Sequence, residues 1–457
     1  YNNVVINPSA TLTASAYSQS TGLGGVLFFL ATGTVANAGT IDMSARGYAA
    51  GTGANDVTGL QGASFAGSQS RSTAYNQGGG GGGGGVFGGY GGGGAGGSHA
   101  GSGTNCANGY NQTNGGYLSP ILYGLNNLSW LTLGSGGGAG GGSTNGSQHY
   151  SGGAGGAGGG IVYIQASSID AAGGSITTVG GNGSGGQTWS GGGGGGAGGA
   201  VYLEAASVAL GLNTVVATGG SGGGGWYQNS TSYAGSGGTG GIGRVRVDAN
   251  SCWAPTGTSC LTGPNPDPYT ESGNLPKYAG GEWVHTFDTN FDATGKVHAN
   301  TQTYGSGPQA AVGLSTTESG SANSDGALSV SSGTVDLNSS ASRDNPNKPG
   351  TQPYAPSVKA TQALSGSSSV TVTPSGDCNT LSICFAAGDE ILIIDMMGGS
   401  AGQYQTRIIA SVQDSPINTL TLTKPLTSIF TSAQAIRVPN FNSVTISFGA
   451  TLTASAY

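Results

Sequence analysis

Residues 159–183 read GGIVYIQASSIDAAGGSITTVGGNG, and residues 198–222 repeat the pattern as GGAVYLEAASVALGLNTVVATGGSG. Each copy consists of a short apolar strand, a turn, a second short strand and a glycine-rich run. Three pairs of matching positions lie 39 residues apart: Ile161 and Ala200, Ile169 and Val208, and Ile176 and Val215. Such a repeat predicts a stacked array in which each unit buries its apolar face against its neighbours.

Two further segments extend the repeat. GGVLFFLATGTVANAGTIDMSARG at 24–47 is an earlier copy, and GGIGRVRVDA at 240–249 starts a third copy at Gly240. Short strands separated by turns at regular spacing are typical of all-β folds. We therefore predict an all-β protein whose residues 1–250 form a β-solenoid-like domain.

Glycine runs recur at matching places, at 78–85, 134–142, 152–160 and 191–199. Ordering one glycine costs roughly 1–2 kcal/mol of backbone entropy, so an ordered run needs dense hydrogen bonding. A polyproline-II-type helix has three residues per turn and directs its N–H and C=O groups outward. Without side chains, such helices can pack side by side and pair these groups. We predict a layer of packed polyglycine-II helices against the strands; the alternative is flexible linker.

The remainder of the chain has a different composition, since only 20 of the 96 glycines lie after residue 250. Residues 251–280 predict a linker with a disulfide loop. Alternating runs with turn signals predict an immunoglobulin-like β-sandwich at 281–360. Residues 361–457 predict a small β-barrel-like module that ends in a strand equivalent to residues 2–17.

The cysteines suggest two short disulfide loops. Cys252 and Cys260 lie in SCWAPTGTSC, and Cys378 and Cys384 lie in CNTLSIC. Disulfides of this kind belong to an oxidising compartment. The alternative is small buried thiols. Cys106 is left over, either free or paired between chains.

The two ends of the chain resemble one another. Residues 2–17 read NNVVINPSATLTASAY and residues 442–457 read NSVTISFGATLTASAY, at a spacing of 440 residues. We interpret the chain as one period of a repeating object, either a tandem repeat or a subunit that stacks head to tail. In the second case the terminal strand of one copy adds to an exposed sheet edge of the next. The alternative is that two similar strands cap two unrelated ends. The predicted polymer-interface residues are Val4, Ile6, Leu12, Val444, Ile446 and Leu452.

Charge and hydropathy exclude several functions. The net charge is −7 with 12 Lys and Arg, and there is no basic run, so we do not expect nucleic acid as a partner. The longest apolar run, GGVLFFLATGTV at 24–35, is too short to span a bilayer. Arg244 and Arg246 alternate on one strand and indicate a solvated strand face.

Enzymatic activity is not predicted. Glycoside hydrolysis by a β-solenoid enzyme needs two carboxylates across a cleft, whereas the acids of the first half are scattered singly: Asp42, Asp56, Asp170, Glu204 and Asp248. Asp170 and Glu204 lie at different places in their repeats.

One segment matches part of a calcium loop. Asp288, Asn290 and Asp292 have the D-x-N-x-D spacing of such a loop. Ala293 follows where the loop needs glycine, so a hairpin turn with Asx hydrogen bonds is the alternative. No other cofactor is expected.

Aromatic residues interrupt or flank the glycine runs. Tyr90, Trp189, Trp226 and Tyr227 are the main candidates. We expect them either to cap the bundle of glycine helices or to form a contact surface for a glycan or a cell.

SATLTASAY followed by GGVLFFLATGTV, LNNLSWLTLGSGGGAGGG at 125–142 and FAAGDEILIIDMMG at 385–398 resemble large, glycine-rich, repeat-containing bacterial cell-surface and fibre proteins, some linked to adhesion, gliding or extracellular filaments. Packed glycine helices also occur in some phage tail-fibre adhesins. The resemblance implies an extracellular or cell-surface location and further copies of the chain as partners. It favours a structural filament unit; the alternative is an adhesin that binds glycans or cells.

Overall fold

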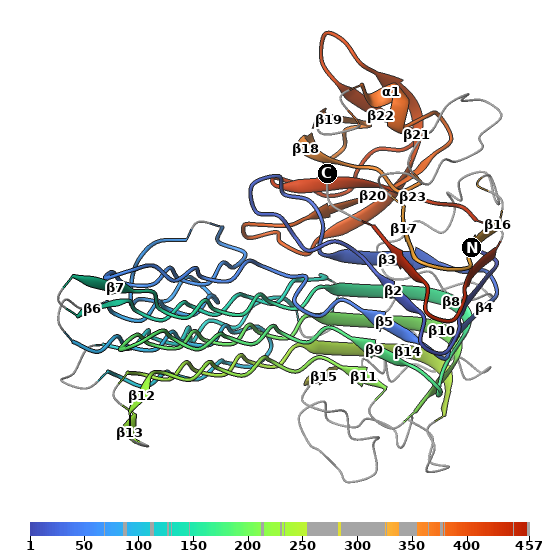
Figure 1. Ribbon diagram of the computed structural model, residues 1–457. Helices are drawn as coiled ribbons and strands as arrows, with labels where there is room; N and C mark the ends of the chain where they lie inside the picture. The colour runs from blue at the N-terminus through green and yellow to red at the C-terminus, as the bar shows by residue number, and fades with distance from the viewer. Residues whose placement is uncertain are drawn as a thin grey trace.

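The fold is almost entirely β-structure, arranged as two parallel sheets, a closed barrel and a long glycine-rich arm (Figure 1). The computed structural model describes residues 1–253 with breaks at 68, 86–88, 110–113, 126–127, 129, 146, 212–213, 229–230 and 233, and then residues 282–284, 325, 327–337, 354–363, 365–374, 378, 380–441 and 443–454.

The larger sheet is parallel throughout. Its strands are β1 (Asn3–Ile6), β3 (Val26–Leu30), β4 (Thr34–Asn37), β8 (Ile161–Ala171), β10 (Ala200–Leu210), β14 (Arg244–Trp253), β15 (Glu282–Val284), β16 (Ala327–Val330) and β24 (Ser443–Ile446). Their order is β15-β14-β10-β8-β4-β1-β24-β16, and β3 pairs with the first half of β8.

A second, smaller parallel sheet contains the short strands that follow, after a turn, six strands of the larger sheet. Its strands are β2 (Thr11–Thr13), β5 (Thr40–Asp42), β9 (Ser175–Thr177), β11 (Val215–Val216), β17 (Thr334–Asp336) and β25 (Thr451–Thr453). Their order is β11-β9-β5-β2-β25-β17, which follows the order of their partners in the larger sheet. The core between the sheets is formed by side chains such as Val162, Val201 and Ile176, all fully buried.

The register confirms the 39-residue repeat. All three predicted pairs, from Ile161↔Ala200 to Ile176↔Val215, are neighbours on adjacent strands. The third copy is displaced, because Ala200 pairs with Arg244 and not with the residue that a start at Gly240 implies. β8 is apolar at each position of Ile161–Ile164 because this part is buried on both faces, by the second sheet and by the barrel.

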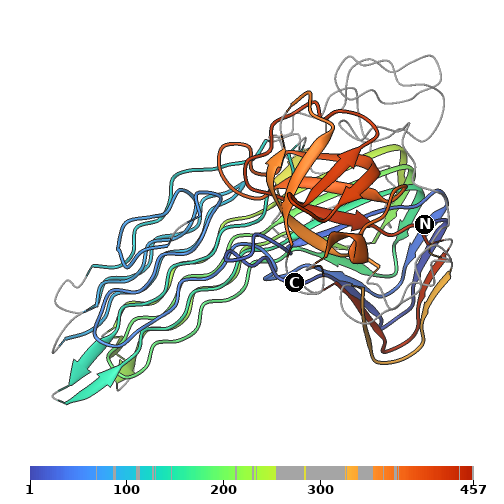
Figure 2. The ribbon, with the colours of Figure 1, turned by 90° about the horizontal axis from the view of Figure 1, so that it is seen from above.

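The glycine-rich segments run side by side away from the sheets and form the glycine arm, defined as residues 78–85, 91–97, 134–142, 152–160, 180–186, 191–199, 219–225 and 234–243 (Figure 2). Segment 191–199 donates to three neighbouring segments in rotation, with N···O distances of 2.8 or 2.9 Å. Gly192, Gly195 and Gly198 donate to Gly235, Gly238 and Gly241; Gly193, Gly196 and Gly199 donate to Ser184, Gly181 and Thr178; Gly194 and Ala197 donate to Gly138 and Ser135. The backbone N–H groups of this segment therefore bond to three neighbouring segments at a period of three residues, and its carbonyl groups accept from three others, 91–97, 152–160 and 219–225.

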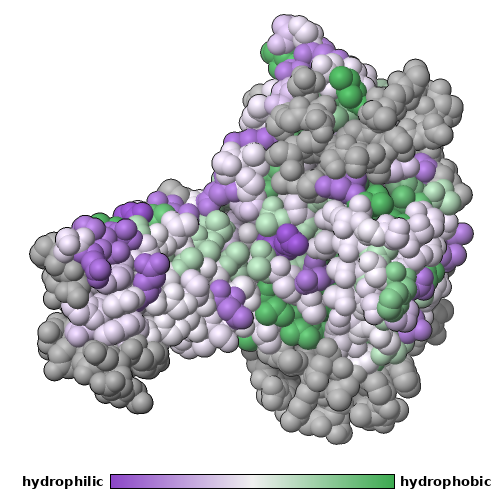
Figure 3. Space-filling model, in the orientation of Figure 1, coloured by the Kyte–Doolittle hydropathy of each residue, from purple (hydrophilic) through white to green (hydrophobic). Residues whose placement is uncertain are grey.

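The free end of the arm carries two short hairpins (Figure 1). They pair β6 (Ser143–Asn145) with β7 (Gln148–Tyr150), and β12 (Tyr227–Gln228) with β13 (Thr231–Ser232). The arm's surface is mostly pale in Figure 3, with strongly hydrophilic residues near the free end. Among the described residues, no helix is long and apolar enough to cross a membrane.

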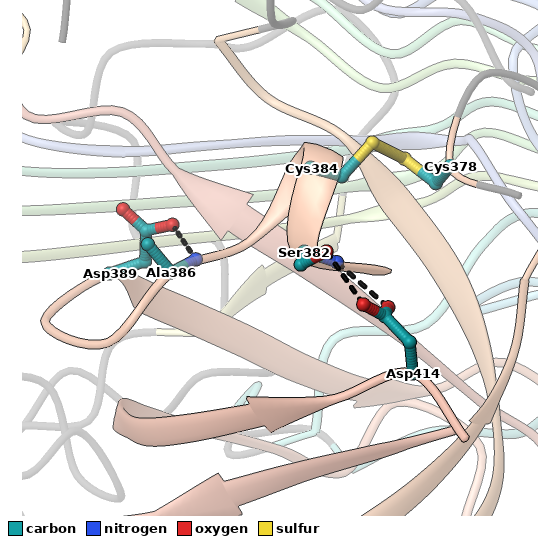
Figure 4. Close-up of a disulfide and its surroundings, with 6 residues drawn as sticks. All are labelled: Cys378, Ser382, Cys384, Ala386, Asp389 and Asp414. Atoms are coloured by element: carbon teal, nitrogen blue, oxygen red, sulfur yellow. Dashed lines mark hydrogen bonds between the residues drawn. A yellow bond between two sulfur atoms is a disulfide. The ribbon is translucent and has the colours of Figure 1, made fainter. Parts of the chain in front are cut away.

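The predicted barrel is confirmed as a closed, antiparallel, six-stranded barrel. Its strands are β18 (Ser357–Ala363), β19 (Ser369–Thr373), β20 (Glu390–Asp395), β21 (Tyr404–Gln413), β22 (Thr419–Leu422) and β23 (Ala433–Val438). A single turn of helix, α1 (Leu381–Cys384), carries the predicted Cys378–Cys384 disulfide (Figure 4). Asp414 accepts hydrogen bonds from the backbone N–H and the hydroxyl of Ser382, which ties this turn to the end of β21.

One assignment from the sequence is wrong. We expected the strands at 325–338 to belong to a β-sandwich, but β16 and β17 pair in parallel with β24 and β25 and complete the two sheets. Alternating polarity does not distinguish the two cases, since both place one face of each strand in a core. The rest of the proposed sandwich, apart from β15 and Tyr354 to Ala360, lies outside the described residues.

Candidate functional site

The similar strands at the two ends of the chain lie against one another. Val4 pairs with Val444, Ile6 with Ile446 and Leu12 with Leu452, so each residue meets its own counterpart at an offset of 440. All six predicted polymer-interface side chains are buried in the core between the sheets. These similar strands in one register place identical side chains opposite one another at the buried positions, such as Val4 and Val444, which gives a self-complementary surface.

Neither end strand is an exposed edge, contrary to the expectation from the sequence. β1 lies between β24 and β4, and β24 lies between β1 and β16. In the described part of the chain, the larger sheet ends instead at β15 on one side and at β16 on the other. The sequence could identify the matching strands but not which strands would flank them.

A buried ion-pair network anchors the barrel to the end strands. The Arg437 side chain, 1% exposed, contacts the carboxylates of Asp325 at 2.9 and 3.0 Å and of Asp389 at 2.9 Å. Asp325 also accepts a hydrogen bond from the Asn440 backbone N–H, 2.6 Å away. Since Asn440 lies between the last barrel strand and β24, this network fixes the path by which the chain enters the end strand.

A second polar cluster lies where the larger sheet meets the barrel. Glu204 accepts hydrogen bonds from Tyr163 at 3.1 Å and from Gln165 at 3.4 Å. Arg246 pairs with Asp248 and lies over the Tyr202 ring, 4.5 Å from its centroid. Burial, followed by the nearby Asp248 charge, raises the pKa of Glu204 well above its usual value of 4.5.

Two expectations from the sequence fail at this cluster. Arg244 and Arg246 are each 2% exposed and do not form a solvated face. Glu204 and Asp248, expected to be isolated acids, lie directly opposite one another on β10 and β14. The two-residue displacement of the third copy hid this pairing, because aligning the glycines at 240–241 with those at 198–199 sets Glu204 against Arg246.

The raised pKa of Glu204 makes stability depend on pH. The folded state holds this proton more tightly than the unfolded state. The contribution of Glu204 to stability is therefore fully present below pH 4.5 and is lost as pH rises toward the folded pKa. We expect Glu204→Gln, which resembles the neutral acid, to remove this part of the pH dependence. Thermal unfolding of both proteins from about pH 5 upward measures it; parallel curves would mean that Glu204 is not the group responsible.

Three of the four predicted aromatic residues meet near the free end of the arm. Tyr90 lies 5.6 Å from Trp189 and 6.0 Å from Trp226 between ring centroids, and the two indoles are 6.3 Å apart. All three side chains are half-buried. Trp189 has a φ of 61°, a left-handed conformation that costs a bulky residue about 1 kcal/mol. The remaining candidate, Tyr227, belongs to β12, and its side chain lies outside the described residues.

The remaining predicted sites are the calcium candidates and the cysteines outside the barrel, which the described residues include only in part. Asp288, Asn290 and Asp292, the calcium candidates, lie outside the described residues, as does Cys260, so the Cys252–Cys260 disulfide stays a prediction. Cys106 has a free thiol that donates to the Gly116 carbonyl at 3.0 Å, and burial raises its pKa to about 11. Within the described ranges, no group of three or more His, Cys, Asp or Glu side chains is placed to hold a metal.

Comparison of the chain with protein-family models, with curated proteins and with solved structures found no match.

Proposed function

We propose that the chain is a structural unit of an extracellular filament or fibrous surface protein, that it has no catalytic role, and that it repeats head to tail with a period of about 440 residues. The observation that carries the proposal is the constant offset of 440 at which β1 and β2 pair with β24 and β25. An all-parallel sheet is polar, since its two ends differ. Repeated end-to-end contacts between such units are heterologous and generate open filaments.

The proposal includes a finer description of the architecture. We interpret the two parallel sheets as a β-solenoid, in which each coil contributes one strand to each sheet. We interpret the glycine arm as packed polyglycine-II helices, supported by the three-residue rotation of its hydrogen bonds. Both elements satisfy their backbone groups internally, and this suits a rod that is exposed outside the cell.

The first test combines the mass of the denatured, reduced chain with electron microscopy of the native material. A denatured, reduced mass near 44.1 kDa together with filaments under the electron microscope would indicate separate subunits. A mass of many such units would indicate one giant chain with tandem copies. Discrete 44.1 kDa particles that form no filaments at any concentration would overturn the proposal.

A second candidate function, an adhesin, is favoured by the aromatic cluster of Tyr90, Trp189 and Trp226. Rigid aromatic side chains offer large contact areas at low entropic cost, and a tryptophan held at positive φ in a glycine-rich arm indicates a role beyond packing. The partner would be a saccharide or a cell surface.

Binding to a glycan array tests this candidate. We expect Trp189→Ala and Trp226→Ala each to weaken binding by tenfold or more, which corresponds to about 1.4 kcal/mol. Tyr117→Ala is the matched control, because Tyr117 is 56% exposed and is not part of the aromatic cluster. Equal losses in all three variants would indicate general damage to the arm, and unchanged binding would leave the rings with a capping role only.

A further inference from the structure

The interface between the beginning and the end of the chain has the properties of an exchangeable contact. We define the N-terminal part as residues 1–253 and the C-terminal part as residues 325–454. The two parts meet through β1 with β24, through β2 with β25, and through the face of the larger sheet that the barrel covers. Each of these contacts can form equally well between two different copies of the chain.

Hydrogen bonds to backbone groups join the two parts at the face that the barrel covers. The Gln434 side-chain amide accepts from the Gly24 N–H at 3.0 Å and donates to the Gly24 carbonyl at 3.1 Å, as a peptide group would. Leu131 N–H donates to the Gly402 carbonyl at 2.7 Å, and Gly398 N–H donates to the Phe65 carbonyl at 2.7 Å. The barrel is therefore docked on the N-terminal part by specific hydrogen bonds at several separate points.

An apolar pocket lies within the interface and is lined by residues of both parts. Its volume is about 80 Å³. The N-terminal part contributes Val4, Leu12 and Phe28 to its lining, and the C-terminal part contributes Leu337, Ile436 and Val444. The side chains of the two parts therefore do not interdigitate fully at this point, unlike those of a close-packed protein interior.

The order of the strands in the larger sheet differs from their order along the chain, which favours an arrangement in which the two parts of one chain are separated. Along the chain, β14 is followed by β15, then β16, then β24, yet β15 and β16 lie at opposite ends of the larger sheet. They are seven strand spacings apart, about 34 Å. Consecutive elements in a stacked array are normally neighbours. The 42 residues from 285 to 326 can bridge this distance, so length alone permits both a closed and an exchanged arrangement.

Resting on the proposed function, we propose that the C-terminal part of one copy docks onto the N-terminal part of the next copy. In this exchanged arrangement β15 and β16 of one chain become neighbours, and β24 of that chain pairs with β1 of the following chain. The strands then follow chain order along a continuous sheet. The partner is a second copy. The β1–β24 and barrel contacts are those already formed within a single chain, and the one added contact joins the two free sheet edges, β15 and β16.

Crosslinking between differently tagged chains tests the exchange. Val5 and Thr445 are cross-strand neighbours on the solvent face of β1 and β24. Val5→Cys in a long-tagged chain and Thr445→Cys in a short-tagged chain, both with Cys106→Ser, are refolded together and treated with a short bismaleimide. We expect a product that contains one long and one short chain. Val57→Cys, at a 42% exposed position, replaces Val5→Cys in the control and should give no such product.

The outcomes separate the two proposals. Filaments without mixed crosslinks, and an internally crosslinked single chain from the double variant Val5→Cys/Thr445→Cys, would overturn the exchange and leave the filament intact. Mixed crosslinks in closed dimers or rings without filaments would support the exchange and overturn the open filament. A ladder of multimers from the double variant is the result expected when both proposals hold.

Discussion

Replacing Asp325 with asparagine is expected to destabilise the protein by about 3 kcal/mol or more, because it leaves the buried Arg437 guanidinium with one carboxylate partner instead of two. Both Asp325 and Arg437 have side chains only 1% exposed, so water cannot replace the lost charge. Urea unfolding of the variant and of the wild-type protein measures the free energy difference.

The control for this prediction is Asp170→Asn, at an exposed position at the end of β8 where the carboxylate accepts one backbone hydrogen bond. It should change stability by about 0.5 kcal/mol or less. A further variant that replaces Asp325, Asp389 and Arg437 together with leucine, leucine and methionine should recover most of the loss, because apolar groups carry no desolvation cost. Equal loss in the triple variant would mean that the hydrogen bonds from the Asn440 and Ala386 backbone N–H groups, and not the ion pairs, make this network important.

Gly194→Ala is expected to disrupt the glycine arm at a cost of about 3 kcal/mol, near the upper end of what overpacking usually costs. An added Cβ at Gly194 would lie 2.0 Å from the Ala95 carbonyl oxygen and 2.4 Å from its carbon. These are backbone atoms of a neighbouring segment, and they are held by hydrogen bonds of their own. Relief would require two segments to separate and to lose several bonds each.

Gly185→Ala is the matched control in the same arm. Its Cβ would meet only the Gly224 carbonyl oxygen, at an ordinary contact distance of 3.5 Å. This variant should lie within about 0.5 kcal/mol of the wild type. Hydrogen exchange of the arm amides provides a second readout, since Gly194→Ala should speed exchange along segment 191–199 and the segments bonded to it. Similar stability and exchange in both variants would contradict the close packing of the arm.

Much of the fold could be predicted from local sequence, because it depends on short-range patterns. The 39-residue spacing sets the register of β8 with β10, and the two cysteines of CNTLSIC, Cys378 and Cys384, close a small loop in the barrel. The candidate sites were harder to predict from the sequence. Tyr90, Trp189 and Trp226 come from three different turns, and only the arm's geometry brings them together. Glycine is so frequent that it is a poor alignment marker, which is why the Glu204–Asp248 pair was missed.

The assignment of β16 and β17 shows a related limit. Their sequence, GALSVSSGTVDL, has the alternation of any half-buried strand, so it could not distinguish a sandwich from the two parallel sheets. The matching ends were easier to recognise than to interpret. The similarity between residues 2–17 and 442–457 indicates equivalent strands, but it does not say whether these strands meet within a chain or between chains.

The hydrogen-bonded packing of the arm divides its positions into two mutational classes. At many glycines of the segments, such as Gly194, a carbonyl oxygen lies about 2 Å from where the missing Cβ atom would be, so no residue other than glycine is tolerated at these positions. The turns that join an outgoing segment to a returning one, such as the turn with Trp189, lie beyond this packing and can change in length and chemistry without disturbing it. Variation in a population of such proteins would therefore collect at the free end, while the frame that presents it stays nearly constant, much as variable loops are carried on a constant scaffold.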